Sequence, residues 1–411
     1  MINRPGAAGG IGGGGIRVAG MGASAEVVWD ESLLAYDMGD DHPLNPVRLA
    51  LTIRLATALG VLDEVPLRKP EPASDAEIER IHDAGYIAAV KAAPESRFDV
   101  GHGLGTPDNP IFPGMHEASA RVVGSSALAA DLIIAGKTDR AVSIAGGLHH
   151  AMPSHAAGFC VYNDCAVAIA RMLDAGIERV AYIDTDVHHG DGVQAAFYDD
   201  PRVLTISIHQ DPRTLWPGTG YPRELGAGAA EGSAVNLPLL PGTGDGMWLR
   251  AFHAVVPSLI ERFRPTVLVT QCGVDSHRTD PLADLGLSVD GHRAIYQTLR
   301  DLAVQHAGGK WLALGGGGYD LVRVVPRSWT HLLAIALDRD VDPETELPRA
   351  WLDVAERVAP GLPLPSAMTE GADVGFEPWG GSADEPVDIA IRDTRRAVFP
   401  LYGLDPDDPR D

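Results

Sequence analysis

The segment at residues 182–192, "YIDTDVHHGDG", places three acids and two histidines directly after an apolar run. Carboxylates and imidazoles are the side chains that bind metal ions and transfer protons. Asp186 and His188 are two residues apart, so in extended chain they point the same way and can reach one ion. Because the apolar run reads as a buried strand, the segment predicts a chemical site at a strand end.

A third ligand is needed, because two are too few for tight binding. Asp275 is the next acid at a predicted strand end. An Asp-His-Asp set leaves positions open for water and substrate, as catalytic zinc or iron(II) requires. A single Asp of this kind more often caps a loop or a helix, so the metal interpretation depends on the whole constellation.

Two histidines and a tyrosine follow other predicted strands. His149 and His150 could be ligands or core residues, but Asp184 and Asp191 flank the ligand pair and need partners. Asp–His pairs orient the imidazole and raise its basicity, which would provide a general base and a general acid. Tyr319 follows four glycines, which either form a flexible turn or let its phenol approach a developing oxyanion.

The elements that must position these groups alternate along the chain. Five apolar, β-branched runs read as strands, at 140–145, 179–184, 202–208, 265–271 and 310–314. Helical patterns occur at 116–137, 245–263 and 290–309, and another opens at Ser74 with a Ser-x-x-Glu capping box. This alternation predicts a single-domain α/β fold with an open, mostly parallel β-sheet flanked by helices, whose strand ends meet along one edge.

Composition restricts the class of protein. The formal net charge of −23 disfavours nucleic acid or an anionic membrane as a partner. The three cysteines, Cys160, Cys165 and Cys272, indicate a reducing compartment. No run is long enough to span a membrane, and nothing resembles a signal peptide, so we expect a cytoplasmic protein.

The two ends of the chain differ from its middle. Residues 1–24 are glycine-rich and are expected to be disordered; their G-x-G-x-x-G follows no strand, so it is discounted as a nucleotide motif. Residues 25–340 are expected to form the catalytic domain. Residues 341–411 are acidic and proline-rich and are expected to wrap the surface of the same domain.

Seven stretches together resemble the arginase–deacetylase fold and, within it, the zinc-dependent histone deacetylase family. They are "GGLHHA", "GFCVYND", "YIDTDVHHGDGVQ", "LTISIH", "PGTG", "CGVDSH" and "LGGGGY". Their order and spacing match over residues 25–335. "DHPLNPVRL" and "GLGTPDNPIFPGMHEAS" are similar to the bacterial acetoin-utilisation (AcuC-type) branch.

The resemblance implies two kinds of metal site. The implied zinc ligands are Asp186, His188 and Asp275, with iron(II) as an alternative metal. A structural potassium ion is implied at Asp184, Asp186, His188, Ser207 and Ile208, several of them through backbone carbonyls. Gly190 and His277 occupy positions where arginases carry further acids, so a second catalytic metal is not expected and His277 is taken as a loop residue.

The resemblance also implies catalytic roles. His150, paired with Asp191, is the implied general base and later acid; His149, paired with Asp184, is its electrostatic partner; and Tyr319 polarises the carbonyl. Because Asp184 would also contact potassium, we expect His149 to hold its proton less firmly than His150.

Further positions are implied along the path of the substrate. Those expected to bind it are Asp108, Gly158, Phe159, Trp216, Leu282 and Gly317. Asp108 is the rim acid that would hold the substrate backbone, although a one-residue insertion precedes it. Arg48 matches an arginine near the acetate exit, with a helix-surface charge as the alternative, and the alternative for Leu282 is core packing.

The function implied is metal-dependent hydrolysis of acetylated amines, foremost acetyl-lysine of proteins. A deacetylase of acetylpolyamines would use the same chemistry, and a non-catalytic acyl-lysine reader could share the fold. The physiological substrate, its acyl-chain length, the choice of zinc or iron, the oligomeric state and the role of the tail stay open at this point.

Overall fold

One parallel sheet organises the molecule. The computed structural model describes residues 25–95, 99–339 and 341–411, and within these the sheet has eight strands in the order β2-β1-β3-β8-β7-β4-β5-β6. The strands are β1 (Ala25–Val28), β2 (Leu67–Arg68), β3 (Arg140–Ser143), β4 (Val180–Asp184), β5 (Val203–Gln210), β6 (Ala234–Leu239), β7 (Val267–Gln271) and β8 (Trp311–Leu314). All pairings are parallel, which confirms the predicted fold class.

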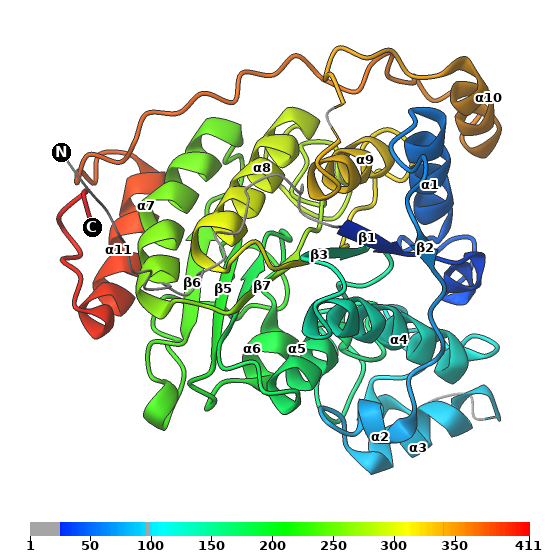
Figure 1. Ribbon diagram of the computed structural model, residues 1–411, viewed down its shortest axis with the longest axis horizontal. Coiled ribbons are helices and arrows are strands. Elements are labelled where there is room, and N and C mark those ends of the chain that lie inside the picture. The colour runs from blue at the N-terminus through cyan, green and yellow to red at the C-terminus, as the bar shows by residue number, and fades with distance from the viewer. Residues whose placement is uncertain (1–24, 96–98, 340) are drawn as a thin grey trace, which may run out of the picture.

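Helices cover both faces of the sheet, as a parallel sheet requires. They are α1 (Val47–Ala58), α2 (Asp75–Ile78), α3 (Ala84–Ala92), α4 (Met115–Ile134), α5 (Asp164–Asp174), α6 (Asp191–Ala196), α7 (Asp245–Phe263), α8 (Val289–His306), α9 (Val325–Ala336), α10 (Arg349–Val358) and α11 (Pro386–Val398). Figure 1 shows α4, α5 and α6 on one face and α7, α8 and α9 on the other. No described helix meets the length and apolarity needed to cross a membrane.

The five predicted strands are the five central ones, apart from shifts at their ends. Every residue of β3, β4, β5, β7 and β8 is buried, which is why continuous apolar runs identify them. The capping box at Ser74 is present, although α2 is a single turn. The sequence did not predict β1, β2 or β6. β1 is only half-buried and contains the charged Glu26, β2 has two residues, and Asn236 and Pro238 interrupt the pattern of β6.

The C-terminal residues form more than a surface wrap. Trp351 in α10 donates its indole N–H to the carbonyl of Leu51 in α1, at 2.9 Å. The segment between α10 and α11 runs along the outside of α8 and α7 (Figure 1), and α11 packs on α7 and β6. The expectation of disorder for residues 1–24 lies outside the described residues.

Arg395 is the anchor of α11. Its fully buried guanidinium donates to the carbonyls of Ala254 in α7 and of Asp405, Pro406, Asp408 and Asp411 in the terminal turn. It also lies over the rings of Trp379 and Phe399. One side chain thus ties the last residues of the chain to the helix layer.

We expect Arg395→Met to lower the free energy of unfolding by about 2–4 kcal/mol, because several buried carbonyls lose a charged donor. Urea unfolding followed by circular dichroism measures the change. Arg396→Met is the matched control, since Arg396 is half-exposed and pairs only with Asp407. Equal stability of the two variants would contradict the anchoring role.

Candidate metal centre and catalytic site

Three side chains converge at the carboxyl ends of β4 and β7. These strands are neighbours, with Asp184 opposite Gln271 in the register. His188 Nδ1 lies 3.1 Å from Asp186 Oδ1 and 3.1 Å from Asp275 Oδ2. One donor atom from each of the three residues lies within 4.8 Å of the other two. The structure therefore brings the predicted ligand set together.

The remaining carboxylate oxygens are bound to the scaffold. Asp186 Oδ2 accepts from Gln271 Nε2 at 2.7 Å and from the Gly317 amide at 2.8 Å. Asp275 Oδ1 accepts from the Val187 amide at 2.9 Å. These bonds fix both carboxylates and leave Asp186 Oδ1 and Asp275 Oδ2 directed at His188.

This donor set fits a divalent transition metal. Burial and the charge of Asp186 raise the pKa of Asp275 to about 6. Burial opposes protonation of His188, but its bonds to Asp186 and Asp275 raise the pKa of the imidazole to about 10. Two buried carboxylates and one imidazole offer a divalent cation two oxygens and one nitrogen, a donor set that suits zinc or iron(II).

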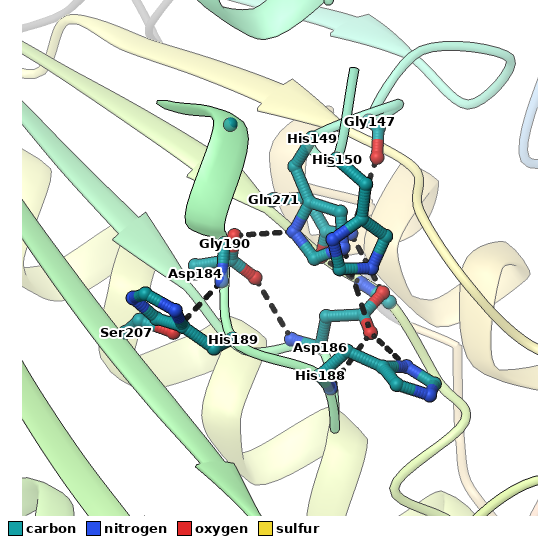
Figure 2. A network of polar contacts seen from close by, with 12 residues as sticks. Gly147, His149, His150, Asp184, Asp186, His188, His189, Gly190, Ser207 and Gln271 are labelled. Atoms are coloured by element: carbon teal, nitrogen blue, oxygen red, sulfur yellow. Dashed lines mark hydrogen bonds and ion pairs between the residues drawn. The ribbon is translucent and has the colours of Figure 1, made fainter. Parts of the chain in front are cut away.

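Both expected histidine–aspartate pairs are present. His149 Nδ1 lies 2.6 Å from Asp184 Oδ2, and His150 Nδ1 lies 2.7 Å from Asp191 Oδ1. Figure 2 shows the two imidazoles side by side next to Asp186, with His149 directed toward Asp184. Their ring centroids are 3.9 Å apart, and all four groups are buried.

The expected order of proton affinity is wrong. Burial opposes the charged form of His149, but Asp184 and Asp186 outweigh it and raise its pKa to about 9. Burial and the neighbouring His149 lower the pKa of His150 to about 4, against the effect of Asp191. The order comes from the charges of Asp184 and Asp186 beside His149, whose Nε2 lies 3.8 Å from Asp186 Oδ1, and from the burial of His150.

Tyr319 enters the same cavity from the end of β8. One small cavity is lined by His149, His150, Asp186 and Tyr319 together with Phe159. Burial and the charges of Asp275 and Asp186 raise the pKa of Tyr319 well above its ordinary value, so its phenol stays a proton donor.

The glycines before Tyr319 are required by close approach. A Cβ on Gly317 would lie 2.0 Å from Asp275 Oδ2. Close packing against Asp275, rather than a flexible turn, therefore explains the glycine at this position of "GGGGY". Asp280, to which the sequence assigned no role, accepts from the Tyr319 amide at 2.8 Å, and burial together with the charge of Asp275 raises the pKa of Asp280 to about 8.

Aromatic side chains surround the cavity. The ring of Trp216 lies 4.6 Å from that of His150 and packs on Gly158, and the ring of Phe159 lies 5.7 Å from that of Tyr319. These contacts place the predicted wall residues beside the predicted catalytic groups. Trp216 is 45% exposed, so it marks the mouth.

Two further predicted positions, Asp108 and Leu282, are not fully buried. Asp108 is exposed, and its carbonyl is 3.3 Å from His42 Nε2, whose ring packs on Phe159. Leu282 is half-buried and is absent from the hydrophobic core of the described residues, so the core-packing alternative fails.

Arg48 is not a surface charge. It is 5% exposed, and its guanidinium donates to the carbonyls of Gly316 at 2.9 Å and Gly318 at 3.1 Å. It lines a second small cavity that shares Leu44 and Leu148 with the first. Its position is therefore directly behind the catalytic cavity.

The residues implied for potassium lie around Asp184. Ser207 is opposite Asp184 in the β4–β5 register, and Ile208 follows it, buried in β5. Ser207 Oγ lies 2.9 Å from His209 Nδ1 and accepts from the Gly190 amide. A Cβ on Gly190 would lie 2.3 Å from Asp184 Oδ2, so an acid for a second catalytic metal does not fit there.

His277 lies in a loop, as expected, but its ring is buried and paired with a carboxylate. It is 1% exposed, and its Nε2 lies 3.1 Å from Glu370 of the C-terminal segment. It is not among the grouped ligands.

Sequence reasoning missed the residues that hold the site together. Asp164 accepts from the amides of Gly147 at 3.0 Å and Leu148 at 2.8 Å, which fixes the loop before the two histidines. Gln271 bonds both Asp186 and the Gly147 carbonyl. The sequence marks these two residues only weakly. Asp164 is a single acid at the end of "GFCVYND", and Gln271 is a polar residue at the end of an apolar strand.

We expect Asp164→Asn to lower kcat roughly 10- to 100-fold, because an amide cannot accept all these bonds and the histidine loop shifts. Metal content should stay at the wild-type level, which elemental analysis checks. Asp174→Asn, at the exposed end of the same helix, is the matched control and should retain full activity. Unchanged turnover in both variants would contradict the positioning role.

Comparison with protein families gives one match over most of the chain. Residues 42–336 match the model of the histone deacetylase domain. The acetoin utilization protein AcuC of Bacillus subtilis (strain 168) is 40% identical over 351 residues, which cover 84% of this chain and 90% of that protein. AcuC of Staphylococcus aureus (strain MSSA476) is 37% identical over 79% of this chain and 85% of that protein.

A solved structure agrees with these matches. The crystal structure of the HDA15 HD domain superposes with a TM-score of 0.71 at 29% sequence identity. The match covers 82% of this chain and 95% of that one.

Proposed function

The chain belongs to the histone deacetylase family, and from this premise we propose that it hydrolyses acetyl-lysine in proteins with zinc held by Asp186, His188 and Asp275. Iron(II) is the alternative metal for the same donors. One observation carries the proposal: Asp186 of the ligand group lines one cavity together with His149, His150 and Tyr319, and each of these histidines is paired with an aspartate.

The protein groups divide the work of amide hydrolysis. A bound divalent cation would polarise the acyl carbonyl and lower the pKa of water. His150 accepts the proton from the attacking water at Nε2, because its Nδ1 is held by Asp191. Tyr319 donates its phenol proton in a hydrogen bond to the developing oxyanion. His150 then returns its proton to the leaving amine, which gives acetate and a free lysine.

His149 and the potassium position complete the electrostatics. His149, paired with Asp184, adds positive charge beside the site. We assign the structural potassium to Asp184, Asp186, His188, Ser207 and Ile208, which the pairing of β4 and β5 supports by bringing Ser207 beside Asp184.

Substrate and product have separate routes in this proposal. Gly158, Phe159, Trp216, Leu282 and Gly317 would line the tunnel for the acyl-lysine chain. Asp108 at the rim would accept from substrate backbone amides. Arg48, in the cavity behind Leu44 and Leu148, would guide acetate out.

A second candidate function is deacetylation of acetylpolyamines. The exposed carboxylate of Asp108 favours it, because a polyamine carries further cations. The apolar aromatic mouth favours a peptide instead. A non-catalytic acyl-lysine reader would not need Tyr319, His150 and the ligand set together.

A turnover screen separates these functions. Metal-loaded protein is assayed against acetyl-lysine peptides and against N-acetylputrescine and N-acetylspermidine. We expect peptide turnover with higher kcat/KM. Polyamine turnover alone would select the second function, and peptide binding without turnover would select the reader.

Tyr319→Phe should lower kcat roughly 10²- to 10³-fold, the effect of removing one oxyanion donor. The variant keeps the partly buried ring and its contact with Phe159, so the fold and metal content should be unchanged. Steady-state kinetics with an acetyl-lysine peptide measures the effect. Wild-type kcat would show that the phenol has no catalytic role.

A further inference from the structure

A third cavity, of about 370 Å³, lies outside the catalytic site. It is open to solvent on one side and is lined by residues of loop 211–222, the end of β6 and α11. Its walls are mostly apolar, formed by Pro212, Pro222, Pro238, Leu240, Pro386 and Ile389. This volume falls within the usual range of ligand-binding cavities.

The cavity and the tunnel mouth share one loop. Arg213 lines the cavity, and Trp216, three residues later, packs on His150. Consecutive Cα atoms are about 3.8 Å apart, so these two Cα atoms are at most about 11 Å apart. An extended peptide with its acetyl-lysine in the tunnel would cover that distance in three or four residues.

Exposed apolar side chains lie at the tunnel mouth and at the cavity. Trp216 is 45% exposed, Leu240 40% and Ile389 43%. Large apolar side chains gathered in this way on a surface mark binding sites. None of the three is needed to pack the core.

Only the net charge of the protein favours a cationic occupant, because the carboxylates at the cavity are paired with arginines. Asp211 and Asp393 stand at the cavity, where Asp211 pairs with Arg213 and Asp393 lies 3.6 Å from Arg392. These pairs leave the apolar walls as the main local attraction, while the net charge of −23 attracts basic segments over longer range.

We propose that this cavity is a substrate subsite for an apolar side chain three or four residues from the acetyl-lysine, in a basic segment of an acetylated protein. The inference rests on the proposed function and deepens it, because an acetylated polyamine has no apolar branch to fill the cavity. It also gives α11 a role in substrate choice.

Peptide kinetics tests the subsite. The substrates are acetyl-lysine blocked at both ends and arginine-containing 13-residue peptides with one leucine three or four residues before or after the acetyl-lysine. Ile389→Glu and Leu240→Glu are compared with Val304→Glu, which alters an exposed residue of α8 away from the cavity. All enzymes are full-length and metal-loaded.

We expect kcat/KM for at least one leucine peptide to fall about tenfold in both cavity variants, through KM, with the blocked acetyl-lysine unchanged and the control at the wild-type level. Equal losses on all substrates, or no loss on any peptide, would overturn the subsite. A wild-type dimer that dissociates in the cavity variants, with unaltered peptide kinetics, would assign the cavity to a second copy and also overturn it.

Failure of the proposed function would look different. In that case the wild-type enzyme would turn over none of these substrates. Fluorescence anisotropy with labelled leucine peptides would then decide the subsite alone. Weaker binding by the cavity variants would support it, and equal or undetectable binding by all proteins would refute it.

Discussion

Replacing Asp275 by alanine should remove the bound metal and nearly all deacetylase turnover. Asp275 provides one of only two carboxylates in the ligand group, and the remaining pair offers too few donors for tight binding. Without the cation nothing replaces its polarisation of the carbonyl, an effect of several kcal/mol on the barrier. Asp186→Ala should behave in the same way.

The fold should survive the loss of the Asp275 carboxylate. The raised pKa of Asp275, to about 6, comes from burial and from the charge of Asp186, so the ionised carboxylate is unfavourable in the metal-free protein. Elemental analysis of purified protein gives the metal content, and circular dichroism confirms folding. Asp284→Ala, at an exposed position of the same loop region, is the control and should keep its metal. Full metal retention in both ligand variants would refute the site.

Burial explains which strands could be predicted from the sequence. A strand buried on both faces carries a continuous apolar run, so the five central strands stand out in the sequence. β6 contains Asn236, whose amide donates to Gln194, and Pro238, so its run is broken. The two-residue β2 carries no pattern at all.

The structure of the C-terminal residues 341–411 was not predictable for a different reason. Its composition is proline-rich and acidic, which is typical of irregular surface segments. Yet α11 buries Val387, Ile391 and Val398 against the body of the protein, and Arg395 fixes it through carbonyls distant in the sequence. Tertiary contacts of this kind leave no local signal.

In the site, the ligands and catalytic groups were predictable from the sequence, and the residues that support them were not. Ligands and catalytic groups follow strand ends, where parallel topology brings them together, so residue type and position identify them. The supporting bonds join positions such as Gln271 and Gly147 across the fold, and no spacing predicts them. The order of the two histidine pKa values was mispredicted for a similar reason, because it depends on the burial of His150 and on the charges of Asp184 and Asp186 acting on His149 through space.

His150→Ala should lower kcat roughly 10²- to 10⁴-fold, the range for loss of a general acid–base group. A general base must be neutral when the reaction starts. With a pKa lowered to about 4, His150 is neutral at pH 7, whereas His149, raised to about 9, is protonated and cannot accept a proton. His149→Ala removes a neighbouring charge rather than the base, so its effect on kcat should be smaller. Both variants should keep their metal, because neither histidine belongs to the ligand group.

The pH dependence distinguishes the two roles. As the pH falls through the pKa of the base, protonation removes its lone pair, so kcat/KM of the wild-type enzyme should decline on the acidic side. That limb should persist in His149→Ala, where the loss of an adjacent positive charge moves it to higher pH, because His150 then holds its proton more firmly. In His150→Ala the limb should disappear from the residual activity. Stopped assays across the pH range with one acetyl-lysine peptide measure all three profiles. If His149→Ala were the more damaging variant at every pH, the base would be His149, and Asp184 rather than Asp191 would be its orienting carboxylate.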